Sequence, residues 1–147
     1  MKRRWGSKMD GQGGNSLVEL ALFLPVLVTI LLGTIDFGRV LYAKVAIVNA
    51  ARVGAEHAAR VGAEPNVTDT ELQTIVKEIV IGEAKPYLVL QEADIAVQRQ
   101  PAPWNPSKID TTVTVTYQFK PVAPFTERFW GGGSELTIRA TTVTRQE

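Results

Sequence analysis

The chain has 147 residues, of which 45% are hydrophobic and 21% charged, and its net charge is +1. This length suffices for one small domain, and the near-neutral charge provides no basic field for binding nucleic acid. The absence of cysteine excludes disulfides and thiolate metal sites, and the single histidine excludes a metal site made from several histidines of one chain. We therefore expect no metal and no cofactor.

A basic segment precedes a long apolar stretch. Residues 1–14 have a net charge of +3, from four basic side chains and one acid: Lys2, Arg3, Arg4, Lys8 and Asp10. Residues 17–35 contain one charge, that of Glu19. As a helix this stretch extends about 28 Å, close to the ~30 Å hydrocarbon core of a bilayer. The pattern favours a transmembrane helix over residues 15–35, and a buried core helix is the alternative.

The flanks of this helix predict its orientation. The apolar run is longer than the ~7–15-residue apolar region of a secretory signal, and no A-x-A-type cleavage site follows it. Both features argue against a cleaved secretory signal. The basic flank predicts a cytoplasmic N-terminus, so residues 36–147 should form an extracytoplasmic domain of a single-pass membrane protein. Pro25 removes one helical hydrogen bond and should kink the helix or melt it locally.

Glu19 is unusual in an apolar helix. A carboxylate in lipid costs about 2–3 kcal/mol or more. It needs a partner, for which a charged group of another subunit is one candidate. In the second interpretation, Glu19 lies at the membrane interface and reaches water.

Residues 36–62 continue the helical pattern with two sets of side chains. Large apolar residues form a stripe: Phe37, Leu41, Val45 and Val48. Small residues form the other set: Ala43, Ala46, Ala50, Ala51, Gly54, Ala55, Ala58, Ala59, Gly62 and Ala63. Because small residues allow close approach of another element, we expect the rest of the domain to pack on this second set. His57 is expected to be a histidine of the helix surface.

The remaining elements predict an α+β fold. Thr68 and Glu71 have the spacing of a capping box before a second helix at 69–83. Strands are expected at about 94–99, 110–120 and 135–145, where period-2 alternation predicts an antiparallel sheet with one buried face. Three prolines predict a loop around Trp104 between the first two strands: Pro101, Pro103 and Pro106.

The segment from Gly14 to Glu19 resembles the processing site of type IV pilin-like proteins. In those proteins a basic leader ends in glycine, and glutamate is the fifth residue after the cut. The wider stretch 14–38 is similar to the TadE-like family, pseudopilins of the tight-adherence (Tad, or Flp pilus) machinery. Further matching residues extend this similarity to about residue 63: Arg39, Tyr42, Ala51, Arg52, Gly54 and Ala55.

The resemblance implies specific roles. A prepilin peptidase would cut between Gly14 and Asn15, so residues 1–14 are the leader and the chain is a substrate and not an enzyme. Glu19 would pair with the freed amine of Asn15 or of a neighbouring subunit. The implied partners are other pilin-like subunits, the Tad inner-membrane machinery and membrane lipid. The implied location is the cytoplasmic membrane, with incorporation into a pilus left open.

Two functions compete for this chain. The first is a pseudopilin or minor pilin that supports a Tad/Flp-type pilus or secretion apparatus. The second is an uncleaved, single-pass anchored domain with an adhesive or scaffold surface, made from four loop aromatics: Trp104, Phe125, Phe129 and Trp130. These aromatics could instead close the ends of the sheet core. No nucleophile triad, paired-carboxylate pocket or metal spacing supports an enzyme.

Overall fold

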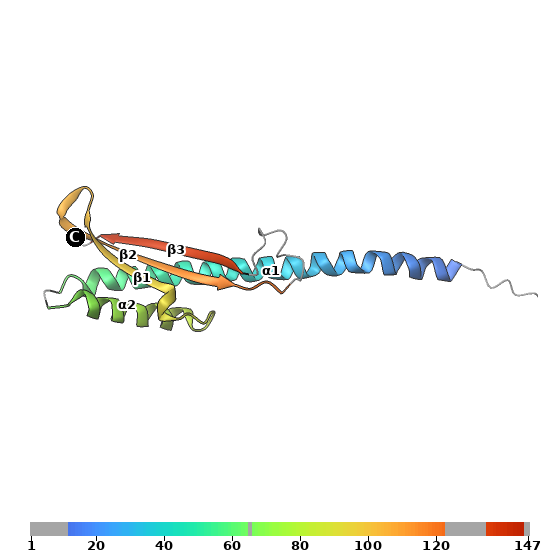
Figure 1. Ribbon diagram of the computed structural model, residues 1–147, viewed down its shortest axis with the longest axis horizontal. Coiled ribbons are helices and arrows are strands. Elements are labelled where there is room, and N and C mark those ends of the chain that lie inside the picture. Colours follow the sequence, from blue (N-terminus) through green and yellow to red (C-terminus); the bar gives the residue numbers. More distant parts are fainter. Residues whose placement is uncertain (1–11, 65, 123–134, 146–147) are drawn as a thin grey trace, which may run out of the picture.

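The computed structural model describes residues 12–64, 66–122 and 135–145 (Figure 1). Its elements in chain order are α1 (Gln12–Val61), α2 (Asp69–Ala84), a short 3₁₀ turn η1 (Glu92–Asp94), β1 (Ile95–Ala102), β2 (Asn105–Phe119) and β3 (Leu136–Arg145). In these residues the strands form one antiparallel sheet in the order β1-β2-β3. The predicted α+β class, with a long first helix, a second helix and a three-stranded sheet, is confirmed.

Figure 1 shows α1 as a long rod that is covered only over its C-terminal half. We call α2, the sheet and the part of α1 from Asp36 onward the head. The most apolar 18-residue window of α1 is 0% buried and is long enough to cross a membrane. The buried core helix considered for this stretch is therefore wrong.

The core of the head lies where α1, α2 and the sheet meet. α1 contributes mostly alanines: Ala43, Ala46, Ile47, Ala50, Ala51, Ala55 and Ala58. The larger side chains come from the other elements: Leu72, Val76, Val80, Val113, Val115, Phe119 and Ile138. The small-residue set of α1 is thus the packing face, as predicted. The stripe of large residues at Phe37, Leu41, Val45 and Val48 stays exposed.

The sheet follows the alternation in the sequence. Val113 and Val115 are fully buried, whereas Thr112 and Thr114 on the other face are not. Ile95 pairs with Val115 across the first ladder, and Ala140 pairs with Val115 across the second. The buried face therefore runs through all three described strands.

The loop predicted around Trp104 is wrong, because β1 and β2 continue through the prolines to a tight turn. β1 ends at Ala102 and β2 begins at Asn105. Pro101 is tolerated because β1 is an edge strand of the described sheet. Pro106 is tolerated because β2 pairs with β3 only from Asp110 onward, so this end of β2 has an unpaired edge.

α1 passes through Pro25 without interruption. The local melting considered for this position does not occur in the described helix. The hydroxyl of Thr29 donates to the carbonyl of Pro25 at 2.8 Å, one turn further on. A bend of the axis at Pro25 stays a prediction.

Candidate functional site: the projecting helix and its attachment to the head

The predicted processing site lies in the first turn of α1. The helix begins at Gln12, so the peptide bond between Gly14 and Asn15 is within helical backbone. A protease needs an extended substrate, and this turn must therefore unwind before a cut. Glycine is about 1 kcal/mol less favourable than alanine in a helix, so Gly13 and Gly14 make this turn easy to unwind.

Glu19 lies one turn after Asn15. An i,i+4 pair on a helix lies on one face, with about 5–6 Å between Cβ atoms. The side chain of Glu19 is exposed, and no ion pair or hydrogen bond joins it to the described residues. The described residues therefore supply no cation for Glu19.

The surface of the projecting segment is apolar all around. Its large hydrophobic side chains are 44–74% exposed: Leu17, Val18, Leu20, Leu22, Phe23, Leu24, Val26, Leu27, Val28, Ile30, Leu31 and Ile35. A helix that is apolar on every side is stable only in lipid or against other helices. The segment can thus act as a membrane anchor or as a helix that packs in an assembly.

Asp36 joins this segment to the head. Its side chain is 7% exposed, and its Oδ1 accepts a hydrogen bond from Arg39 Nη1 at 2.8 Å. Oδ2 accepts the backbone N–H of Val122 at 2.9 Å. The guanidinium of Arg39 also lies over the ring of Phe119, 4.9 Å from its centroid. The end of β2 is thereby held at the residue where the apolar run ends.

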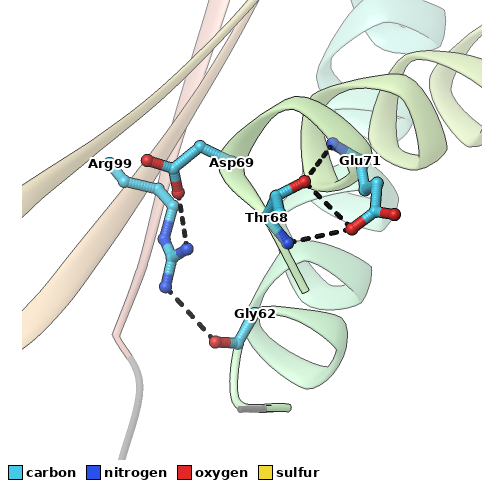
Figure 2. Close-up of polar contacts among 5 residues, drawn as sticks. All are labelled: Gly62, Thr68, Asp69, Glu71 and Arg99. Atoms are coloured by element: carbon cyan, nitrogen blue, oxygen red, sulfur yellow. Dashed lines mark hydrogen bonds and ion pairs between the residues drawn. The ribbon is translucent and has the colours of Figure 1, made fainter. Parts of the chain in front are cut away.

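The opposite end of the head is held by Arg99 of β1 (Figure 2). Arg99 Nη1 pairs with Asp69 Oδ1 at 2.7 Å, and Nη2 donates to the carbonyl of Gly62 at 3.3 Å. Asp69 begins α2, and Gly62 follows the last residue of α1. A cation at a helix C-terminus satisfies a free carbonyl and the helix dipole. One side chain therefore fixes the connection between the two helices.

The capping box of α2 lies beside this ion pair (Figure 2). Thr68 Oγ1 accepts the backbone N–H of Glu71, and Glu71 Oε2 accepts the backbone N–H of Thr68 at 3.0 Å. The hydrogen bond from the Thr68 backbone, and then the one from its hydroxyl, lower the pKa of Glu71. The predicted capping box is confirmed.

Gly54 lies on α1 where side chains of α2 and β2 come close to the helix backbone. A Cβ built on Gly54 would overlap Val80 Cγ2 and would touch Val76 and Val113 at 3.5 and 3.6 Å. The expected packing reason for a glycine here is thus confirmed. His57 is exposed on the helix surface, as expected.

Of the four loop aromatics, the described residues include Trp104. Trp104 is 54% exposed in the β1–β2 turn, where Arg145 lies 5.3 Å from the centroid of its ring. Phe125, Phe129 and Trp130 fall outside the described residues. Among the described residues, no three His, Asp or Glu side chains are placed to hold a metal ion.

Sequence reasoning missed the Asp36–Val122 and Arg99–Gly62 contacts. Asp36 carried a signal, because it is the first charge after the apolar run. Arg99 carried none, because its partner Asp69 lies 30 residues away. Both contacts depend on tertiary packing.

A comparison with known protein families finds a match within α1. Residues 14–56 match the model of the TadE-like protein family, which confirms the resemblance seen in the sequence. The matched segment covers the apolar run and most of the small-residue face of α1, and leaves α2 and the sheet outside. No curated protein and no solved structure matches the chain.

Proposed function

We propose that this chain, TadE-like over residues 14–56, is a pseudopilin or minor pilin-like structural component in the biogenesis of a Tad/Flp-type pilus or secretion apparatus. The TadE-like family is a structural, pilin-like family associated with the Tad pilus and is not an enzyme family. The observation that carries the proposal is the uncovered apolar half of α1, which projects from a head folded on the other half of the same helix.

In this proposal a prepilin peptidase hydrolyses the bond between Gly14 and Asn15. Water adds across the amide, so Gly14 gains a carboxylate and Asn15 gains an amine that is protonated at neutral pH. The reaction removes the +3 leader and creates one positive charge a single helical turn from Glu19. The apolar helix thereby gains a cation that can neutralise its carboxylate, either in the same chain or in a neighbour.

The proposal also implies a cellular location and an orientation in the membrane. The apolar helix 15–35 lies in the cytoplasmic membrane with its N-terminus in the cytoplasm and the head outside. The partners are the prepilin peptidase, other pilin-like subunits and the Tad inner-membrane machinery. An unpaired carboxylate in lipid is unfavourable by about 2–3 kcal/mol, which favours moving the helix into a packed assembly where Glu19 is paired.

The test is the mass of the protein in the presence and absence of the peptidase. The full chain is co-expressed with a prepilin peptidase, and the membrane form is analysed by intact mass and N-terminal sequencing. We expect loss of residues 1–14 and a new N-terminus at Asn15. Gly14→Val should prevent the cut, because a subsite fitted to glycine has no room for a side chain.

Gly33→Val is the matched control. Gly33 is in the same apolar helix, and a Cβ there meets nothing within 4 Å. This variant should be cut normally. Retention of Met1 on the wild-type chain after exposure to an active peptidase would refute processing.

The alternative is an uncleaved anchored domain with an adhesive or scaffold surface. One observation favours it: Trp104 is 54% exposed at a hairpin tip, on the end of the sheet away from Asp36. The same mass measurement separates the two functions, because the alternative requires that the leader remains.

A further inference from the structure

The base of the head contains a pocket at the point where α1 leaves its apolar run. The pocket has a volume of about 450 Å³, and its walls include Arg39, Tyr42, Tyr87, Tyr117 and Phe119. Tyr42 and Tyr87 meet edge to face, with ring centroids 5.6 Å apart. Three tyrosines and one arginine thus surround a cavity at one end of the domain.

The distance of this pocket from the membrane follows from the helix itself. The apolar run ends at Ile35, so Arg39 and Tyr42 lie about 6 and 10 Å further along the axis. The polar layer on each side of a bilayer is about 5–8 Å thick beyond the hydrocarbon core. Arg39 therefore lies in the headgroup layer if the run spans the membrane. The side chain of Tyr42 leans toward the N-terminus of the helix and reaches the outer boundary of that layer.

Four apolar or aromatic side chains are exposed between the level of Asp36 and that of Tyr42. Phe37 is 59% exposed, Tyr42 55%, Tyr87 50% and Val122 63%. Val122 is held at the level of Asp36 by its hydrogen bond to that carboxylate. We call these four residues the base surface. Tyrosine rings are enriched at membrane interfaces, where the ring contacts acyl chains and the hydroxyl contacts water.

We propose that the base surface lies in the headgroup layer of the leaflet that α1 leaves, and that the pocket takes one phospholipid headgroup with its phosphate at Arg39. This inference depends on the proposed placement of residues 15–35 in the membrane. The side chain of Arg39 is 46% exposed even though Nη1 is bonded to Asp36. A guanidinium has five N–H donors in a planar fork that fits phosphate oxygens.

The rest of the pocket fits a lipid better than a free anion. Ile35 belongs to the apolar run and also lines the pocket. A headgroup bound at Arg39 would therefore have its acyl chains beside the apolar helix. Such seating would hold the head upright on the membrane at two points, through α1 and through the base surface.

The first experiment measures where the base surface lies. The chain has no cysteine, so single cysteines can carry a nitroxide label in the full protein, reconstituted in nanodiscs of phosphatidylethanolamine and phosphatidylglycerol. We expect labels at Val122→Cys and Phe37→Cys, both in the base surface, to be accessible to oxygen and shielded from a water-soluble nickel complex. Glu64→Cys, exposed at the far end of the head, should show the opposite pattern.

A label at Leu27→Cys in the apolar run distinguishes a wrong membrane placement of the helix from a wrong position of the base surface. Oxygen access at Leu27 together with full nickel access at Val122 and Phe37 would overturn the proposed position of the base surface and leave the membrane helix intact. Nickel access at Leu27 would overturn both the membrane placement and the inference that depends on it.

The second experiment tests the pocket. Native mass spectrometry of the full chain released from nanodiscs should show one retained phospholipid. Arg39→Gln should weaken retention roughly tenfold or more, the effect of losing one charge-assisted contact. Tyr87→Leu tests the pocket without touching the Asp36 pair and should also reduce retention.

The control is Arg60→Gln, because Arg60 is an exposed arginine at the other end of α1. This variant should retain lipid like the wild type. The headgroup site would be refuted if folded Arg39→Gln and Tyr87→Leu retain as much phospholipid as Arg60→Gln does. Retention of free phosphate without a phospholipid would also refute it.

Discussion

The carboxylate of Asp36 accepts the backbone N–H of Val122, a residue 86 positions later in the chain, at 2.9 Å. Asp36 is the first charge after the apolar run, and Val122 lies three residues after Phe119, where β2 ends. The same carboxylate pairs with Arg39. This contact fixes the position of the sheet along α1, and therefore the distance between the head and the projecting helix.

Asp36→Asn should loosen this attachment. The change keeps the size of the side chain but removes the charge that faces Arg39, and an amide cannot accept at both oxygen positions. A buried polar group that loses its partner costs about 1–3 kcal/mol. We expect that decrease in the free energy of unfolding of the full chain in detergent micelles, measured by near-ultraviolet circular dichroism.

Glu56→Gln is the control for Asp36→Asn. Glu56 pairs with Arg52 at 3.5 Å, and both side chains are at least half exposed. An exposed i,i+4 pair contributes about 0.3–0.5 kcal/mol. Equal effects of the two substitutions would show that Asp36 does not hold the head.

Gly54→Ala should destabilise the head because the new methyl group overlaps Val80 Cγ2. Valine is stiff at χ1 in a helix and cannot turn away easily. Overpacking of a core costs about 1–3 kcal/mol, which exceeds the gain of up to about 1 kcal/mol from replacing a helical glycine. Chemical denaturation of the full chain measures the difference.

Two variants test this explanation. Gly82→Ala, in α2, meets nothing within 4 Å and should stabilise the chain by up to about 1 kcal/mol. Val80→Ala makes room for the new methyl group, so the double variant Gly54→Ala/Val80→Ala should lose less stability than the two single losses added together. Strict additivity would contradict the overlap.

Acid should weaken the start of α2 through Glu71. Its pKa is lowered by the hydrogen bonds from Thr68, so the folded state binds the proton less tightly than the unfolded chain does. The stabilisation is therefore complete above the ordinary glutamate pKa of about 4.3 and disappears as the pH falls through the lowered value. Thr68→Ala removes the donor hydroxyl, so its unfolding free energy should vary less with pH over this range.

Thr68→Ser is the matched control, because serine retains the hydroxyl of the cap. Its pH dependence should follow that of the wild type in a denaturation series taken from neutral pH to below the ordinary glutamate range. If Thr68→Ala and the wild type keep parallel pH profiles, the hydroxyl of Thr68 does not contribute to the lowered pKa of Glu71.

Local patterns in the sequence predict most of the fold. The spacing of Thr68 and Glu71 predicts a cap that depends on neighbouring residues only, and the alternation around Val113 and Val115 predicts the buried face of β2. These features succeed because their physical causes lie within a few residues.

Tertiary packing decides the features that the sequence does not predict. Periodicity alone cannot choose between the two apolar faces of α1; the small residues around Gly54 predict the face that is used, because two helices and a strand must approach closely there. The prolines near Trp104 indicate a loop, yet unpaired strand edges accommodate them. The partners of Arg99, and the long-range partner of Asp36 at Val122, lie far away in the sequence and become neighbours only after folding.

Glu19→Leu distinguishes assembly from simple anchoring. If the apolar helix is only an anchor, the change removes a carboxylate from lipid and is favourable by about 2–3 kcal/mol. If Glu19 pairs with a freed N-terminal amine in an assembly, the change leaves that amine without a partner in a medium of low dielectric constant. Removal of one partner of a buried pair costs about 3–5 kcal/mol, a factor of more than 100 in association.

We therefore expect Glu19→Leu to insert in the membrane and fold its head, but to fail in assembly. Carbonate extraction measures the insertion, near-ultraviolet circular dichroism measures the folding of the head, and co-purification with pilin-like subunits measures assembly. Glu19→Gln should fail in the same way, because it keeps the size of the side chain but not the charge. Val18→Leu, a change on the neighbouring position that affects no charge, should assemble normally. Wild-type assembly by Glu19→Leu and Glu19→Gln would refute the pairing and would favour the anchored adhesive domain, since an anchor needs no carboxylate in its apolar helix.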